Sequence, residues 1–301
     1  MIRSVTVINA KQESLVLTLE DPSNGYAITD ITGLGPTKAE INTMDNVTSD
    51  GATFNSARVG TRNIVLTIRI IGDDVETLRE ELTRYFPTKQ NITLRFTTDN
   101  RIVYTEGYVE SNDATIFSKT AGCKISVLCP YPYFKMGYGH PDTVTFSGVD
   151  AAFEFPFSNE STSDKLIEFG IVQMNSAGNL LYTGDSDVGI VITVHALGPI
   201  NDVRIYNTLT HEKMIFDMTK VKTMTGTAFG AGDELVISTV KNDKYVRMLR
   251  GGVYTDVLRC LDLSSDWFTV TKGDNAFSYT VDTDINDIML KIENDVVFEG
   301  V

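Results

Sequence analysis

The chain has 301 residues, of which 42% are hydrophobic and 22% are charged, as in an ordinary globular protein. It contains no apolar run long enough to span a membrane, so we expect no membrane anchor. It begins without a signal-peptide pattern, so we expect the protein to be assembled in a cytoplasm. A formal net charge of −14 argues against a protein that grips phosphate backbones, so we expect no sequence-specific nucleic-acid binding.

The negative charge is concentrated in the second half of the chain. Residues 1–135 contain 14 Lys and Arg against 16 Asp and Glu, a net charge of −2, whereas residues 136–301 contain 12 against 24, a net charge of −12. Most of this charge favours solubility, and its uneven distribution indicates two parts of different character.

The first half alternates between apolar and polar residues with the period of β-strands. Such patterns predict strands over residues 14–19, 63–71, 92–96, 101–111 and 123–129. Asp99 and Asn100 lie between two of these strands and predict the turn of a β-hairpin.

A single helix is predicted in the first half, over residues 72–88. Val75, Leu78, Leu82 and Tyr85 recur at helical spacing, and Pro87 ends the pattern. Asp73 is the predicted N-cap, with Glu76 three residues later as in a capping box.

After residue 140 the sequence predicts strands only, separated by Gly, Asn and Asp, which is typical of a jelly-roll β-sandwich. The predicted strands include "VGIVITVHAL", "ELVISTV", "DVLRCL", "AFSYTV" and "DIMLKI". Between the halves lies "CPYPYF" (129–134), whose prolines cannot donate to a sheet. We therefore predict two domains, 1–138 and 139–301. The alternative is that this segment is a loop inside one large β domain.

The sequence offers no catalytic constellation. His140, His195 and His211 lie outside any nucleophile motif, and no phosphate-binding loop or zinc motif is present. Glu154, Glu160 and Glu168 are general-acid candidates by residue type alone, as a cell-wall hydrolase would need. We therefore predict that the chain is not an enzyme, with no catalytic residues and no cofactor.

Metal binding is not expected either. A zinc site needs paired Cys or His at short spacing, which the sequence lacks, and Cys123, Cys129 and Cys260 are predicted to be buried reduced thiols. The segment "DTDINDIMLKIE" (282–293) places Asp282, Asp284, Asn286 and Glu293 at calcium-loop positions. It lacks the required glycine and is flanked by strand patterns, so it is interpreted as an acidic turn.

Trp267, the only tryptophan, is a candidate for binding. An exposed Trp in a sandwich can stack on a sugar ring, whereas a buried one fills the core, and the core is favoured. Glycan recognition by the second domain is the alternative function that this residue keeps open.

Several motifs, taken in order, resemble the distal tail protein family of bacteriophages. In the first half they are "DITGLGPTKAEI", "DGATFNSARVGTRNIVLTIRIIG", the single helix, the hairpin and "CPYPYF", including Gly33-Leu34, Asp50-Gly51, Arg58 and Arg62. In the second half they are "GDELVISTVKND" and "VLRCLDLSSDWFTVTKGDNAFSYTV", with the matching positions Gly232, Asp233, Leu263, Ser265, Trp267, Phe268, Gly273, Asn275 and Tyr279.

This resemblance implies a structural protein of the virion tail tip or baseplate. It implies an N-terminal β-sandwich or sheet domain with one α-helix and a β-hairpin, and a C-terminal galectin-like, jelly-roll β-sandwich. Family members form a homo-oligomeric ring, usually a hexamer. The implied partners are the tail tube protein, the tail-associated hub or lysin protein, and receptor-binding or baseplate proteins. Because sheet edges need partners, the hairpin at Asp99 and Asn100 is predicted to donate an edge to a neighbouring copy.

Overall fold

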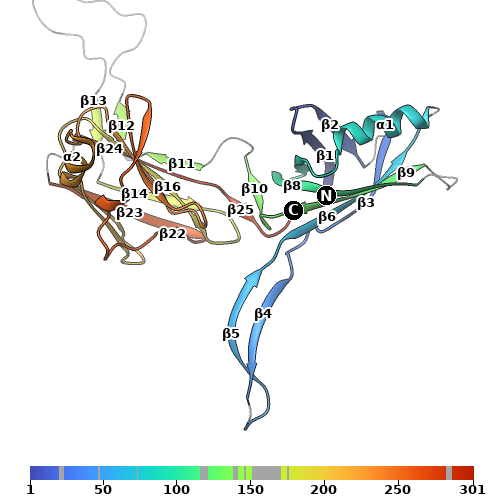
Figure 1. Cartoon of the computed structure of the whole chain (residues 1–301), viewed down its shortest axis with the longest axis horizontal. Helices are drawn as coiled ribbons and strands as arrows, with labels where there is room; N and C mark the ends of the chain where they lie inside the picture. Colours follow the sequence, from blue (N-terminus) through green and yellow to red (C-terminus); the bar gives the residue numbers. More distant parts are fainter. Residues whose placement is uncertain are drawn as a thin grey trace, which may run out of the picture. The chain divides into compact units, whose positions relative to one another are not determined.

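The computed structural model describes residues 1–19, 24–46, 48–72, 74–115, 121–137, 142–145, 147–150, 171–174, 176–282 and 287–301. The chain is mainly β, as predicted, and forms two compact units (Figure 1). The first unit combines Met1–His140 with Val297–Val301, and the second is Pro141–Val296. Several residues weighed from the sequence lie outside the described residues: Asp73, His140, Glu154, Glu160, Glu168, Asp284 and Asn286.

The first unit is a β structure with one described helix, as the sequence predicts. Its elements are β1 (Ile2–Asn9), β2 (Ser14–Thr18), β3 (Tyr26–Thr32), β4 (Ala39–Asp45), β5 (Ala52–Val59), β6 (Arg62–Ile70), α1 (Val75–Tyr85), β7 (Asn91–Thr98), β8 (Ile102–Thr115), β9 (Gly122–Cys129), β10 (Phe134–Met136) and β25 (Val297–Phe298). Nine of the strands form one sheet in the order β25-β10-β8-β7-β1-β2-β3-β6-β9.

The long strand β8 closes this sheet on itself. Its first half pairs with β7, from Ile102 with Thr97 to Tyr108 with Asn91. Its second half pairs with β9, ending with Thr115 opposite Gly122. A register shift between Val109 and Ser111 lies at the changeover, as expected where a strand bends. The result is a closed β core rather than an open sheet.

This closure corrects one expectation. The hairpin turn at Asp99 and Asn100 is confirmed, because β7 ends at Thr98 and β8 begins at Ile102. The prediction that this hairpin offers a free edge is wrong, because β7 also pairs with β1 and β8 also pairs with β9 and β10. Asp99 instead makes hydrogen bonds within the chain, because its carboxylate accepts from the Met1 amino group and from Arg3 Nε.

Helix α1 confirms the amphipathic pattern, although its cap differs by one residue. Leu82 and Tyr85 are buried, and Leu78 contributes a backbone oxygen that accepts from the Tyr26 hydroxyl at 2.9 Å. The described N-cap is Asp74, whose carboxylate accepts from the Thr77 backbone N–H. The hydrogen bond from the Thr77 hydroxyl, together with the one from its backbone N–H, lowers the pKa of Asp74. Asp74 takes the role predicted for Asp73 because it immediately precedes the first helical residue.

The second unit is built from antiparallel strands. They are β11 (Asp142–Thr145), β12 (Ser147–Asp150), β13 (Ile171–Met174), β14 (Ala177–Tyr182), β15 (Val188–Gly189), β16 (Val191–Ala196), β17 (Asp202–Asn207), β18 (Lys213–Asp217), β19 (Glu234–Ser238), β20 (Tyr245–Arg250), β21 (Val253–Asp256), β22 (Thr269–Val270), β23 (Gly273–Val281) and β24 (Ile288–Asn294). The two larger sheets have the orders β11-β24-β16-β19-β20-β21 and β14-β23-β17-β18. Strand β16 in one sheet and β17 in the other both alternate buried and less buried residues, so each sheet contributes one face to a core.

Two short helical segments in this unit correct the expectation of strands only. Helix α2 (Thr219–Thr225) follows β18 and ends at Gly226 with φ +81°. The segment "DVLRCL", predicted as a strand, contains the 3₁₀ turn η1 (Leu258–Cys260). Both are too short to show helical periodicity, and Thr is common in α2, so local pattern gave no signal for either.

The three cysteines are free and buried, as predicted. Cys123 and Cys129 lie at opposite ends of β9, and Cys260 lies in η1. Burial raises the pKa of each thiol, to about 11 for Cys260. They therefore behave as core side chains rather than as nucleophiles.

Candidate functional site

The most exposed secondary structure in the first unit is an arm, which we define as strands β4 and β5 with their turn, residues 39–59. All fifteen strand residues are exposed, and the two strands pair only with each other (Figure 1). Gly51 lies in the turn at φ +94°, a backbone conformation that glycine adopts readily. Asp50-Gly51, one of the pairs on which the family resemblance rests, lies at this turn.

The arm has one apolar and one polar face. Residues opposite each other in the ladder share a face, and alternate residues along a strand share a face. Ile41 pairs with Ala57, Ala39 pairs with Val59, and Thr43 pairs with Phe54. Ile41, Phe54 and Val59 therefore lie on one side, with exposed fractions of 63%, 63% and 37%. A register shift between Asn42 and Thr43 brings Phe54 to this side.

The opposite face of the arm carries polar partners. Arg58 Nε donates to Glu40 Oε2 at 2.7 Å, and Asn42 Nδ2 donates to Ser56 Oγ at 3.1 Å. These contacts lie in solvent and stabilise the ribbon little, because exposed ion pairs are screened by water. The polar side chains named here are thus paired within the chain, although Met44, which is 69% exposed, lies on the same face. The face that carries Ile41, Phe54 and Val59 has no cover among the described residues.

A buried arginine anchors the base of the arm. Arg62 is only 2% exposed and lies at the start of β6, directly after the arm. Its guanidinium donates to four carbonyl oxygens: Pro132 at 2.6 Å, Gly33 at 2.5 Å, Gly35 at 2.7 Å and Glu299 at 2.7 Å. It also lies over the Phe134 ring, with Cζ 4.3 Å from the centroid. Burial lowers the pKa of Arg62, but guanidinium remains charged.

This arginine joins segments that are far apart in the sequence. Gly33 and Gly35 precede the arm, Pro132 belongs to the "CPYPYF" segment, and Glu299 lies near the C-terminus. Strand β25 pairs with β10 through Phe298 opposite Phe134, and Arg101 donates to the Gly300 carbonyl at 2.9 Å. The last five residues, which fall within the predicted domain 139–301, therefore fold with the first unit. No pattern in the sequence indicated this return.

The other residues named from the sequence occupy structural positions. In the second unit the Asp233 carboxylate accepts from Arg250, while Asn275 and Tyr279 are buried in β23. His195 lies in β16 with Nδ1 3.3 Å from Glu234, and His211 follows Thr210 at φ +61°. Asp282, from the calcium-like segment, accepts from the backbone N–H groups of Asn201 and Asp202. Glu293 lies in β24, 2.7 Å from Lys291 Nζ.

Trp267 lies just before β22 and is partly buried. The Nζ of Lys244 lies 5.0 Å from its ring centroid. This cation occupies a ring face that a stacked sugar would need. Neither a metal cluster nor a membrane-spanning helix is found among the described residues.

Known proteins share this domain and fold. Residues 11–120 match the family model of the phage tail protein RIFT-related domain. No curated protein matches the sequence. The crystal structure of the SPP1 Dit protein, described as a paradigm of the hub adsorption apparatus in phages that infect Gram-positive bacteria, has a TM-score of 0.62 at 12% identity, covering 98% of this chain and 99% of that chain. A chain of the phage P2 baseplate, in its activated conformation with Ca, has a TM-score of 0.48 at 12% identity, with 98% of each chain covered.

The domain match lies in the first unit and includes the arm, its anchor Arg62 and helix α1, and the similarity in fold to SPP1 Dit extends over both units. The resemblance indicated by the sequence is thereby confirmed at the level of domain and fold: residues 11–120 match the phage tail protein RIFT-related domain, and the whole chain has a fold similar to that of SPP1 Dit.

Proposed function

We propose that the protein is a structural ring component of the phage tail tip or baseplate, and that the arm carries the ring contact. The observation behind this proposal is the exposed apolar face formed by Ile41, Phe54 and Val59. A two-stranded ribbon is marginally stable alone in water, so a ribbon of this length needs a covering surface. The covering surface in this proposal is a second copy of the chain, as the resemblance to ring-forming tail proteins implies.

Closed rotational symmetry is compatible with this kind of contact. An arm that projects from one copy onto a different surface of the next makes a head-to-tail interface, and such interfaces form a ring when the rotation between copies closes and a filament when it does not. Six copies is the number implied by the resemblance to distal tail proteins. The same resemblance implies contacts with the tail tube protein, the tail-associated hub protein, and receptor-binding or baseplate proteins.

Charge is compatible with a ring through which DNA passes. Of the net charge of −14, only −2 belongs to residues 1–135, so the ring-forming unit is close to neutral. A near-neutral or acidic surface releases few counterions from DNA and does not hold it. No catalytic step is part of the proposed role.

The second unit is proposed to be a galectin-like sandwich that meets external components. Two larger antiparallel sheets with alternating burial support this assignment. Glycan binding through Trp267 is not favoured, because Lys244 already lies against its ring.

Ring formation is tested by measuring mass in solution. We expect multi-angle light scattering of the purified protein to give a closed oligomer of about six copies, and the double variant Ile41→Asn, Phe54→Asn to give monomers. Asn42→Ala with Ser56→Ala on the polar face is the matched control and should leave the oligomer intact. The proposal would be refuted if the wild-type protein stayed monomeric in solution at every concentration and if assembled tails contained single copies of it.

A further inference from the structure

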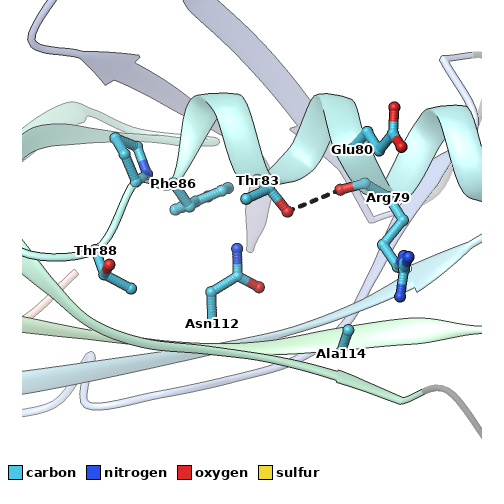
Figure 2. A pocket seen from close by; sticks show the side chains of 8 residues that line it. Arg79, Glu80, Thr83, Phe86, Thr88, Asn112 and Ala114 are labelled. Carbon is cyan, nitrogen blue, oxygen red and sulfur yellow. Dashed lines mark hydrogen bonds between the residues drawn. The ribbon is translucent and has the colours of Figure 1, made fainter.

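The structure contains a groove between α1 and the second half of β8 that resembles a site for strand addition. It has a volume of about 550 Å³ and is lined by Arg79, Glu80, Thr83, Phe86, Pro87, Thr88, Asn112 and Ala114. Figure 2 shows α1 above and β8 below, with the Asn112 side chain directed from the strand toward the helix. We refer to these eight residues as the α1–β8 groove.

One edge of β8 ends in this groove without a partner. On the side away from β9, the β8 ladder continues from β7 to the residues after the helix, where Val109 exchanges backbone hydrogen bonds with Lys89 and Gln90. Beyond Val109, the stretch Ser111–Thr115 has no backbone partner on that side within the described part of the chain. An extended segment placed there would continue the sheet through main-chain hydrogen bonds.

A second observation points to a missing partner at the same place. The Nδ2 of Asn112 is buried and has no hydrogen-bond acceptor among the described residues. Leaving such a donor unpaired costs about 1–3 kcal/mol, so a buried amide of this kind usually has a partner in the assembled state. Because Nδ2 has almost no accessible surface in the single chain, a backbone carbonyl of an added strand would supply this acceptor only after the Asn112 side chain turns outward.

We infer that the α1–β8 groove receives the arm of a neighbouring copy. The arm and the groove each have an unpaired strand edge. In the arm, β4 and β5 each have one unpaired edge among the described residues, and their apolar face is open. The unpaired stretch of β8 has five residues and the arm strands have seven and eight, so the lengths are compatible. This inference rests on the proposed ring and names the surface that accepts the arm.

The positions of donor and acceptor explain why the contact is made between copies. The arm joins the core at Arg62, opposite Cys129 at one end of the β6–β9 ladder. The groove lies near the other end, where Ala114 is opposite Cys123 and Arg69 is opposite Gly122. Strands of eight or nine residues separate the two ends by roughly 25 Å. An arm and a groove at opposite ends of one unit form the two complementary halves of a head-to-tail contact.

The first test fills the groove without disturbing the core. Thr83 is exposed on α1 and lines the groove, whereas its neighbour Arg84 is also exposed, pairs with Glu13 and does not line the groove. We expect Thr83→Trp to reduce the oligomer to monomers in sedimentation velocity, and Arg84→Trp to retain it. Circular dichroism melting of both variants separates loss of assembly from loss of folding. An intact ring in a folded Thr83→Trp protein overturns the groove assignment while leaving the proposed ring unaffected.

The second test identifies the occupant by cross-linking two different chains. One chain carries Ala114→Cys in the groove and the other carries Thr53→Cys on the arm, against native cysteines that are buried. After mixing and treatment with a short bismaleimide, we expect a covalent pair only when both chains are present. A chain with Ile102→Cys, at the opposite end of β8, replaces the groove chain as the control and should not cross-link. Cross-linking through Ile102→Cys instead, or none in an assembled ring, would show that the arm binds elsewhere.

Discussion

At the scale of single residues, Arg62 is the side chain that joins the most distant segments of the first unit. Its buried guanidinium donates to four carbonyl oxygens and lies over an aromatic ring. Buried guanidinium is stable only with this degree of hydrogen bonding, because the desolvation of a charge is costly. The sequence marked Arg62 through a family resemblance, but its four acceptors come from three separate segments, residues 33–35, Pro132 and Glu299.

Replacing Arg62 should therefore destabilise the first unit strongly. Arg62→Ala leaves four carbonyls without a donor and opens a cavity beside Phe134, so we expect a loss of about 3 kcal/mol. For a unit of this size the melting temperature should fall by roughly 6–12 °C in differential scanning calorimetry. Arg58→Ala, on the exposed face of the arm, should change it little. Equal effects of the two substitutions would contradict the anchoring role.

Asp233 gives a residue-scale prediction about pH. Its side chain is 8% exposed, and the hydrogen bonds from Arg250 lower its pKa from the ordinary value of 3.8. A carboxyl with a lowered folded-state pKa stabilises the fold above its unfolded pKa, and this stability is lost as pH falls through the folded value. Wild type should thus exceed Asp233→Asn in melting temperature near pH 6, and the difference should shrink below pH 3.8. A difference that is constant with pH would show that the charge is not involved.

At the scale of elements, strand β25 shows how a two-residue strand can matter. Val297 and Phe298 are 1% and 7% exposed, and Arg101 lies over the Phe298 ring with Cζ 4.1 Å from the centroid. These contacts add a short C-terminal strand to the sheet edge at β10. The arm is the opposite case, since both of its strands are longer and yet neither is buried.

Truncating Phe298 should weaken the first unit and leave the second unchanged. Phe298→Ala removes a buried ring, for which a cost of about 3 kcal/mol is typical. Trp267 is the only tryptophan and belongs to the second unit, so its fluorescence reports that unit alone. In urea, we expect far-UV circular dichroism to reveal earlier unfolding in the variant while the Trp267 transition keeps its midpoint. Val301→Ala, at the terminal residue, serves as the control. A shift in the Trp267 midpoint would mean that β25 stabilises both units.

At the scale of the whole molecule, the main features are two compact units and a strongly unequal charge. Residues 136–301 carry −12 of the net −14, so copies held side by side repel one another through this region. The proposed contact between copies is an apolar ribbon in a groove, which salt does not weaken by screening. In the proposed assembly, the apolar contact of the arm attracts neighbouring copies, whereas the negative charge of residues 136–301 repels them and is screened by salt.

Salt should therefore promote assembly. Raising sodium chloride from about 50 mM to about 500 mM shortens the Debye length from roughly 14 Å to about 4 Å. We expect sedimentation velocity to show a larger fraction of oligomer at the higher salt, at constant protein concentration. Sodium sulfate at matched ionic strength separates charge screening from ion-specific effects. Dissociation on adding salt would indicate that ion pairs, rather than the apolar arm, hold the copies together.

The sequence by itself determined the mainly β composition, the position of α1, the hairpin at Asp99 and Asn100 and the burial of the three cysteines. These features depend on local periodicity, capping and turn chemistry, which are determined by residues that are close together in the sequence. Only the tertiary structure decided that β8 closes the sheet, that β25 returns to β10, that Arg62 joins three separate segments, and that the arm has one open apolar face. Each of these depends on residues separated by tens to hundreds of positions, and in the arm on a register shift that a sequence pattern does not encode.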